Sequence, residues 1–401
     1  MRARRPGGLY LLCLASLGGI LIAVALAARA GCQPSTVVAG LAISFIPYSG
    51  ALAVSRSLHR MPPLRLAALA LLFGAPLVLA PPLLSDDLYR YLWDGRLWLE
   101  GFNPYRLAPD DPSLASLRDE VWLKINNRPI GSIYPPLSEL LFLVAAWAGG
   151  QAWIVKLLAL SAQAVTAAFE ARISTSSRAP LALALNPLLL SESALNGHLD
   201  ILCGLALLIT AWALAQQRQV RAGIAVSAAV GLKVVGLALL PLFSRRPKAL
   251  LVATFASLLL LVPLVVSRTP LDPVSGAGQF ARRWRGNDSL FALADWACRQ
   301  ALGDASADLA ARSMIVLAFL VLCALVVKRR VPSLPAARFL IWSVLLLSPQ
   351  VHPWYLAWLL PLELFAGGSA GLVWSAAVLC AYAPLDLWVS QGVWRMPPWL
   401  Q

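Results

Sequence analysis

Two adjacent carboxylates, Asp86 and Asp87, begin the polar segment SDDLYRYLWDGRLWLEGFNPYRLAP, which follows a long apolar run. Charge is costly at the edge of an apolar segment, and two neighbouring acids repel each other, which raises the pKa of one of them. A carboxyl group with a raised pKa suits general-base catalysis near neutral pH. Helix capping is the alternative, because Ser85 and Asp86 resemble an N-cap and a first-turn acid. Capping explains only one of the two acids.

Four further polar motifs interrupt the apolar chain, and we expect all of them on the same face of the protein. They are YPP at Tyr134–Pro136, NGHLD at Asn196–Asp200, RWRGND at Arg283–Asp288 and HPWY at His352–Tyr355. A lone histidine beside a helix end is more often structural than catalytic, and the NDS of the third motif is a weak glycosylation pattern. Independent structural roles would scatter such motifs over both faces, so their gathering on one face predicts a polar site there.

A single lysine, Lys233 in GLKVVG, lies within an apolar stretch. A lysine at the centre of a membrane helix costs about 2.5 to 3.5 kcal/mol, so it should face a polar partner or extend to the membrane interface. A phosphate group is the functional alternative, and Arg282, Arg283 and Arg285 could bind it bidentately. The sequence has no nucleotide-binding glycine-rich loop, so the phosphate would arrive on a lipid.

The composition requires these residues to be positioned by membrane helices. About 59% of the chain is hydrophobic and 13% is charged, whereas soluble domains contain about 25% charged residues. Apolar runs of roughly 14 to 23 residues recur along the chain, and about 20 residues cross a bilayer. We therefore predict an all-α polytopic membrane protein with about 11 to 13 transmembrane helices. The first run, which ends near Arg29 and Cys32, could be a signal peptide but is expected to be a retained helix. The six cysteines are expected to be small hydrophobic residues, and no metal site is expected.

The basic residues predict the direction of the chain through the membrane, because cytoplasmic loops are rich in Lys and Arg. The net charge of +14 is therefore read as a topology signal rather than as a sign of nucleic-acid binding. The predicted cytoplasmic turns contain Arg2, Arg4 and Arg5; Arg56, Arg60 and Arg65; Arg172 and Arg178; Arg218 and Arg221; Arg245, Arg246 and Lys248; and Lys328 to Arg330. A single integral membrane domain over 1–401 follows. Its expected parts are three spans in 1–84, an extracytoplasmic loop at 85–133, central helices at 134–266, a second extracytoplasmic loop at 267–313 and C-terminal helices at 314–401.

Two regions do not fit a simple series of crossings. Pro135 to Gly149 and Ala152 to Ala171 read as two helices where an odd number of crossings is needed, so one should be partial or tilted. Arg221 to Arg245 is too short for two spans and contains Lys233, which predicts a broken or re-entrant pair.

The segment after Asp86 has the pattern of an amphipathic helix. Leu88, Tyr91, Leu92, Trp98 and Leu99 form an apolar stripe, whereas Asp87, Arg90 and Asp94 share the opposite face. This pattern predicts a helix that lies on the membrane surface. The large first extracytoplasmic loop is therefore expected to contain amphipathic interfacial helices.

Taken in order, the motifs resemble the polytopic GT-C glycosyltransferases that use polyprenyl-phosphate sugars. The resemblance is to bacterial mannosyltransferase-like members, related to polyprenol-phosphomannose-dependent α-1,6-mannosyltransferases and to glycosylphosphatidylinositol mannosyltransferases. The motifs that carry it are DDLYRYLWDGR, GFNPY, IYPPL, NPLLLSESALNGHLD, GLKVVGLALLPL, RWRGNDSLF and SPQVHPWYLAWLLPL.

The resemblance implies a catalytic carboxylate in the first external loop. The related enzymes have a D-x-Y-x-Y pattern, which falls here on Asp87, Tyr89 and Tyr91, so Asp87 is expected to be the base and Asp86 to support it. A strict D-x-D motif is absent, and the resemblance implies transfer without a metal or other cofactor.

The expected reaction is inverting transfer of a hexose, with mannose favoured, from a polyprenyl phosphate to an acceptor hydroxyl on the extracytoplasmic face. Partners would be the lipid-linked donor, a glycan, glycolipid or other hydroxyl acceptor, and membrane lipids. The membrane would be the bacterial inner membrane. The expected donor-phosphate ligands are Lys233, Arg282, Arg283, Arg285 and His352. The expected substrate ligands are Tyr89, Tyr91, Tyr134, Asn196, His198, Asp200, Asn287, Asp288, Trp354 and Tyr355. A lipid or small-molecule transporter or flippase without glycosyl transfer is the alternative, although we see no inverted repeat.

Overall fold

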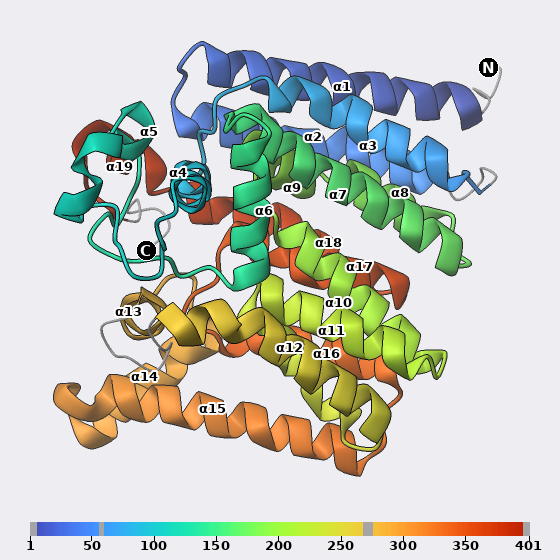
Figure 1. The fold of residues 1–401 in the computed structure, drawn as a ribbon. Helices are drawn as coiled ribbons and strands as arrows, with labels where there is room; N and C mark the ends of the chain where they lie inside the picture. The colour runs from blue at the N-terminus through green and yellow to red at the C-terminus, as the bar shows by residue number, and fades with distance from the viewer. Residues whose placement is uncertain (1–5, 56–59, 268–275, 396–401) are drawn as a thin grey trace.

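The structure is a computed structural model that describes residues 6–55, 60–267 and 276–395. Within these ranges the chain is helical, and its only β pairing is an isolated parallel bridge between Gly286 and Gln350. Most of the long helices run side by side along one direction, as Figure 1 shows. The predicted all-α class is therefore confirmed.

The N-terminal half contains the helices that surround the first polar loop. Its elements are α1 (Pro6–Arg29), α2 (Pro34–Ser55), α3 (Pro63–Val78), α4 (Asp87–Leu99), η1 (Pro112–Leu117), α5 (Glu120–Leu123), α6 (Pro136–Trp147), α7 (Ala152–Ile173), α8 (Arg178–Leu185), α9 (Pro187–Leu190) and η2 (Ser191–Leu195). Several of these helices begin with proline, whose fixed φ suits the first turn and whose missing N–H costs nothing there.

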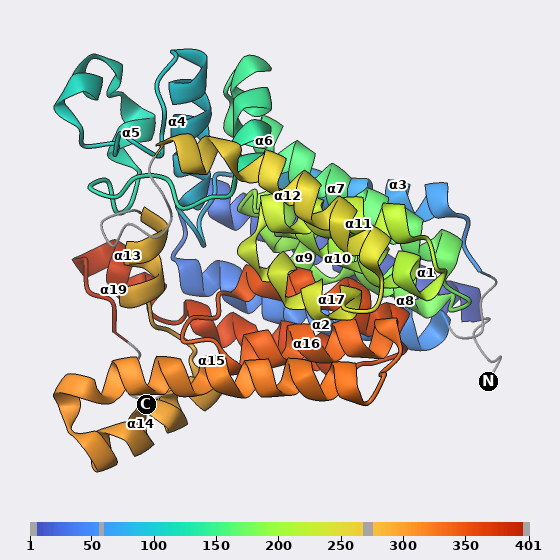
Figure 2. The same ribbon diagram turned by 60° about the horizontal axis from the view of Figure 1, so that its bottom comes forward.

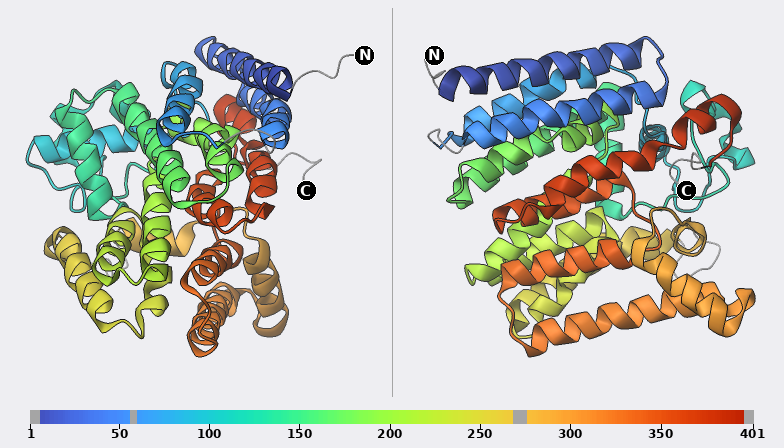
Figure 3. Two further views of the ribbon diagram at one scale, coloured as in Figure 1. Left: turned by 90° about the vertical axis from the view of Figure 1, so that its right-hand side faces the viewer. Right: turned by 180° about the vertical axis from the view of Figure 1, so that it is seen from behind.

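The C-terminal half completes the bundle. Its elements are α10 (Asp200–Ala215), α11 (Gln219–Leu232), η3 (Val234–Phe243), α12 (Pro247–Ser267), α13 (Gly276–Arg283), α14 (Ser289–Leu302), α15 (Asp304–Lys328), α16 (Ser333–Leu347), η4 (Pro353–Tyr355), α17 (Leu356–Phe365), α18 (Ala370–Ala377), η5 (Val378–Tyr382) and α19 (Leu385–Gln391). The last helices lie on the back of the bundle, where η5 and α19 contact α2 (Figure 3).

Within the described ranges, five helical stretches are long and apolar enough to cross a membrane: Gly7–Arg29, Pro34–Ser55, Ala152–Ile173, Asp304–Lys328 and Ala370–Gln391. Shorter apolar helices of 10–17 residues lie between them. Large apolar side chains are exposed along α12 and α15, as expected where lipid is the solvent; Leu251 and Leu317 are examples. The chain is therefore a multi-pass integral membrane protein. The count of 11 to 13 crossings remains a prediction.

Helices α4 and α6 run across the ends of the long helices instead of alongside them (Figures 1 and 2). They pack closely because Gly95 of α4 meets the backbone carbonyl of Phe142, where a side chain would clash. The sequence predicted that one of the two helices in 135–171 is a partial or tilted crossing. The structure agrees, since α7 has the length of a span whereas α6 lies across the bundle.

The polar face expected to lie toward water on α4 is instead buried, which corrects the simple surface-helix prediction. Arg90 Nε contacts Asp94 at 2.8 Å, and the Asp94 side chain is fully buried. A second buried acid, Glu139 of α6, accepts hydrogen bonds from Trp98 at 2.9 Å and from Ser132. The sequence places Arg90 and Asp94 on one face of the helix, but their burial depends on the packing of α6 and could not be predicted.

The break predicted around Lys233 is confirmed. Helix α11 ends at Leu232, Lys233 is extended with φ −152° and ψ 138°, and η3 begins at the next residue. The hydroxyl of Ser138 donates to the carbonyl of Leu232 at 2.7 Å, which satisfies a backbone group freed by the break. Gln219 at the start of α11 and Ser244 after η3 line the same cavity, so the two segments form a hairpin with Lys233 at its tip. That the hairpin is re-entrant in the membrane stays a prediction.

Candidate functional site

The adjacent acids lie where α4 begins. Asp86 is its N-cap and Asp87 is its first residue. The backbone N–H of Asp87 donates to Ser85 Oγ at 3.3 Å, and the amide of Asn126 donates to the carboxylate of Asp86. Asp86 is thus held within the loop by Asn126.

The environment of Asp87 raises its pKa to about 7, chiefly because burial removes water from the carboxylate and next because Asp86 repels its charge. The positive charge of Lys233 and a hydrogen bond from Tyr134 oppose the rise, whereas Asp200 adds to it. The pKa of Asp86 is also raised, mainly by burial. The sequence-based expectation that one of two neighbouring acids has a raised pKa agrees with this arrangement.

Lys233 faces acids contributed by other parts of the chain. Its Nζ lies 3.4 Å from Oδ1 of Asp200 and 5.3 Å from the centre of the Tyr134 ring. Asp200 Oδ1 also accepts from the indole N–H of Trp358 at 2.8 Å, whereas Oδ2 is buried without a hydrogen-bond partner. Lys233 therefore has the polar partner that its position requires.

Three rings stack beside these charges. Trp354 lies between His198 and His352, with ring centres 3.9 Å from the first and 4.2 Å from the second. Tyr91 contacts His198 Nδ1 through its hydroxyl at 3.2 Å, while His198 Nε2 is buried without a hydrogen-bond partner. Burial and the charge of Lys233 lower the pKa of His352 to about 3, so this imidazole is neutral at pH 7.

The NGHLD motif is buried, and so are residues 191–195 before it. Asn196 accepts from the backbone N–H of Leu84 at 3.2 Å and donates to Glu192 at 3.2 Å. Asn196 therefore connects the segment before α4 to the bundle.

Two charged residues near the site were missed in the sequence. Glu192 accepts from the hydroxyl of Tyr382, and its Oε2 lies 3.7 Å from His198 Nε2. Lys156 of α7 is buried and donates to the carbonyl of Ala80. Both lie in apolar stretches, where an ionisable residue is a functional candidate by default, so that signal was available.

The other aromatic candidates divide between the site and its surroundings. Tyr355 stacks on Trp358 with ring centres 4.0 Å apart and contacts the ring of His352 edge-on. Tyr89 instead lies on another side of α4, where the Lys124 amine is 5.2 Å from its ring centre.

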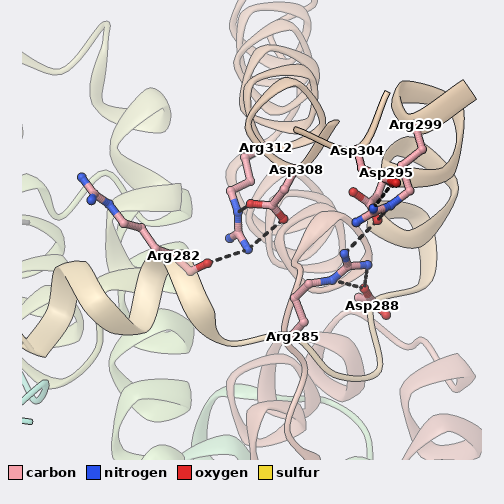
Figure 4. A network of polar contacts seen from close by, with 8 residues as sticks. All are labelled: Arg282, Arg285, Asp288, Asp295, Arg299, Asp304, Asp308 and Arg312. Carbon is pink, nitrogen blue, oxygen red and sulfur yellow. Dashed lines mark hydrogen bonds and ion pairs between the residues drawn. The ribbon is translucent and has the colours of Figure 1, made fainter. Parts of the chain in front are cut away.

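The RWRGND motif is only partly joined to this site. Gly286 pairs with the strand-like segment at Gln350, and the amide of Asn287 donates to the carbonyl of Val351 at 2.8 Å. Arg285 instead contacts Asp288 at 2.7 Å and Asp295 at 2.8 Å (Figure 4).

This ion-pair network affects the pKa of Asp295 but does not include the Arg282 side chain. Hydrogen bonding to Arg285 holds the pKa of Asp295 below its ordinary value. The exposed side chain of Arg282 points away from the network, whereas its carbonyl accepts from Arg312 at 3.2 Å (Figure 4). The side chain of Arg283 lies outside the described part of the structure.

The structure thus brings together Asp87, Tyr91, Tyr134, His198, Asp200, Lys233, His352, Trp354 and Tyr355 from the sequence-based candidates. Asp86 and Asn196 lie at the edge of this cluster, which we call the Asp87 site. Among the described residues, no group of three or more His, Cys, Asp or Glu side chains is arranged to hold a metal ion.

Comparison with known proteins gives one match. A family model described as alpha-(1->6)-mannopyranosyltransferase, N-terminal domain, matches residues 15–245, which is more than half of the chain. The matched region contains Asp87, His198, Asp200 and Lys233 but ends before the HPWY motif. No curated protein and no solved structure matches the chain. The predicted glycosyltransferase class is confirmed: the chain belongs to the α-(1→6)-mannopyranosyltransferase family, whose members are mannosyltransferases that require a sugar donor and an acceptor.

Proposed function

We propose that this protein transfers mannose from a polyprenyl-phosphate donor to an acceptor hydroxyl in one inverting step, with Asp87 as the general base. The acceptor oxygen bonds to the anomeric carbon while the bond from that carbon to the phosphate oxygen breaks. The acceptor proton passes to the carboxylate of Asp87, and polyprenyl phosphate leaves with the electron pair.

The raised pKa of Asp87 is the observation that carries this proposal. A base is most effective when its pKa lies near the working pH, because it is then both ionised and a good proton acceptor. An ordinary aspartate is a much weaker base. Burial and Asp86 together bring Asp87 to a pKa of about 7.

Lys233 is the proposed ligand of the departing phosphate. Its amine is only partly exposed and is held at the hairpin tip by Asp200, 3.4 Å away. Charge grows on the leaving phosphate in the transition state, and a preorganised cation in a site shielded from water stabilises that growth. His352 is neutral, so it would contribute a hydrogen bond rather than a charge. Arg282, whose guanidinium has no acidic partner among the described residues, remains a second candidate, whereas Arg285 is already neutralised by acids.

Two buried atoms that lack a hydrogen bond support sugar binding beside the base. Within the described part of the chain, His198 Nε2 and Asp200 Oδ2 have no hydrogen-bond partner, although Glu192 lies 3.7 Å from the histidine nitrogen; a buried polar atom without a hydrogen bond costs about 1 to 3 kcal/mol. Hydroxyl groups of the sugar would pair with both atoms. The Trp354 ring and the Tyr91 and Tyr134 hydroxyls would shape the same pocket around the sugar.

We further propose that the Asp87 site faces the extracytoplasmic side of a bacterial inner membrane. The basic turns at Arg218 and at Arg329 lie at the opposite end of the bundle, as the positive-inside rule requires of cytoplasmic loops. The whole chain would act as one membrane domain, with 85–133 as the catalytic loop and 267–313 as a second external loop. Residues 268–275 of that loop lie outside the described residues.

The test is transfer by purified protein, supplied with polyprenyl-phosphate mannose and a panel of hydroxyl acceptors. Wild type should form a mannosylated product, and Asp87→Asn should lose at least about a hundredfold in kcat/KM, the usual contribution of a general base. Asp110→Asn is the matched control, because Asp110 is an exposed acid of the same loop. Transfer by Asp87→Asn at the wild-type rate would exclude Asp87 as the base. Donor flux without transfer would instead favour the transporter.

A further inference from the structure

A second polar cavity lies at the end of the bundle opposite the Asp87 site. It has a volume of about 280 Å³ and is formed where the turns before α11, between η3 and α12, and between α15 and α16 meet. These three turns meet at the right-hand end of the bundle in Figure 1, whereas α4 and α5 lie at the left. We call it the basic cavity.

The walls of the basic cavity carry positive charge and no negative charge. Arg245, Arg246 and Arg330 line it, and no Asp or Glu does. Arg246 donates to the carbonyl of Leu242 at 2.6 Å and to Ser333 Oγ at 3.2 Å. Within the described residues, none of the three arginines forms an ion pair with a carboxylate. Three unneutralised guanidinium groups around one hollow repel one another, and an anion between them would relieve that repulsion.

Helix N-termini also meet at the cavity. Helix α11 begins at Gln219 and α16 at Ser333, and both residues line the cavity. The first turn of a helix has unpaired N–H groups that can donate to an anion. The C-termini of α10, η3 and α15 precede the same turns, so the partial charges of the helix ends offset one another, and the three arginines carry the positive charge of the cavity.

Two residues that line the cavity have a positive φ, a backbone conformation that residues other than glycine rarely adopt. Arg330 has φ 53° and Gln217 has φ 57°. Arg330 follows the C-terminus of α15, and glycine would fit its left-handed conformation with less strain. The turn nevertheless presents a guanidinium to the cavity. The side chain of Gln219 adds a buried amide oxygen without a hydrogen-bond partner, which is available to a hydroxyl group of a ligand.

We propose that the basic cavity binds a phosphate group and is separate from the donor site. Arginine forks match phosphate oxygens in pairs, and the serine hydroxyls of Ser244 and Ser333 would donate to the remaining oxygens. The phosphate could belong to the headgroup of an anionic phospholipid or to a free phosphate ester. Valines of α15 form an apolar wall on one side of the cavity, which suits the glycerol part of a phospholipid. This inference does not depend on the proposed function.

The experiment measures binding of two probes to the full-length protein. Phosphatidylglycerol is titrated against the detergent-purified protein by native mass spectrometry, with phosphatidylcholine as the neutral lipid. Inorganic phosphate and glycerol phosphate are titrated separately by calorimetry. Saturable binding of phosphatidylglycerol alone identifies a lipid headgroup, and binding of the soluble probes identifies a free phosphate ester.

Variants inside and outside the cavity lining distinguish a specific phosphate site from non-specific attraction of anions to the basic turns. The double variant Arg245→Gln, Arg330→Gln should weaken binding by at least about tenfold, because each hydrogen bond to a charged group contributes that much or more. Arg329→Gln removes one positive charge directly beside Arg330 but outside the cavity lining, so it is the matched control for the single variant Arg330→Gln; it should change the affinity less than about twofold by the same arithmetic. Ser244→Glu places a carboxylate among the arginines. This carboxylate should pair with them in place of the phosphate and so abolish phosphate binding.

Equal loss in the double variant and in Arg329→Gln would overturn the proposal, as would unchanged binding in Ser244→Glu. Absence of binding of every probe to the wild-type protein would also overturn it. If the double variant does not fold, the comparison of Ser244→Glu with wild type decides alone.

Discussion

The pH dependence of mannosyl transfer is the sharpest consequence of the Asp87 site. The pKa of Asp87 rises from 3.8 to about 7. The difference of roughly three units corresponds to roughly 4 kcal/mol of preference for the neutral carboxyl over the carboxylate. If only the ionised form accepts the proton, about 1% of the enzyme is active at pH 5 and about half at pH 7. The value of kcat/KM should therefore rise about fiftyfold between these two pH values and level off above pH 8.

The assay is kcat/KM for the donor from pH 5 to pH 9, because this parameter reports ionisation in the free enzyme. An aspartate with an ordinary pKa would give less than about a twofold change over the same interval. Asp86→Asn removes a negative charge that raises the pKa of Asp87, so its profile should shift toward lower pH by roughly one unit. A flat profile in wild type, or an Asp86→Asn profile that coincides with wild type, would refute the assignment.

Three further predictions test other parts of the structure. Asp87→Asn should raise the thermal unfolding midpoint at pH 8, because a carboxyl whose folded-state pKa is raised destabilises the fold as pH rises from about 4 to 7; the gain should shrink at pH 5. Lys233→Ala should raise the donor KM and lower kcat, and Lys233→Arg should restore part of both, whereas unchanged kinetics would remove Lys233 from the site. Arg285→Gln should lower the free energy of unfolding by about 1 kcal/mol or less, since its ion pairs are partly exposed and Asp295 keeps Arg299, while donor KM changes little; a tenfold rise in KM would instead assign Arg285 to the phosphate.

The sequence predicted the features that depend on local pattern. The apolar runs indicated membrane helices, and Lys233 within one of them indicated a break, which the extended backbone at that residue confirms. The adjacent acids indicated an unusual pKa before any neighbour was known. These predictions succeed because hydrophobicity, helix length and charge repulsion between neighbours are properties of short segments.

Long-range packing was not predictable from a single chain. Asp200 and Lys233 are far apart in the sequence, and their 3.4 Å contact requires the hairpin to fold beside α10. Arg285 was expected to bind phosphate, although Asp288 three residues later pairs with it; its second partner, Asp295, lies on the next helix and could not be recognised. The burial of Asp94 likewise depends on α6 lying across the bundle. In each case the deciding partner lies on another element, and composition and periodicity do not identify it.

The hairpin of α11 and η3 also fixes a depth. Helix α11 has 14 residues, so it places its C-terminal residue about 21 Å from the basic turn at Arg218. The hydrocarbon layer is about 30 Å thick, so with Arg218 at one surface of the layer an amine at the hairpin tip would sit about two-thirds of the way across it. Each added or deleted residue in α11 would move that amine by about 1.5 Å and turn it by about 100°. The length of α11 would therefore couple bilayer thickness to the position of Lys233 relative to any lipid-borne substrate.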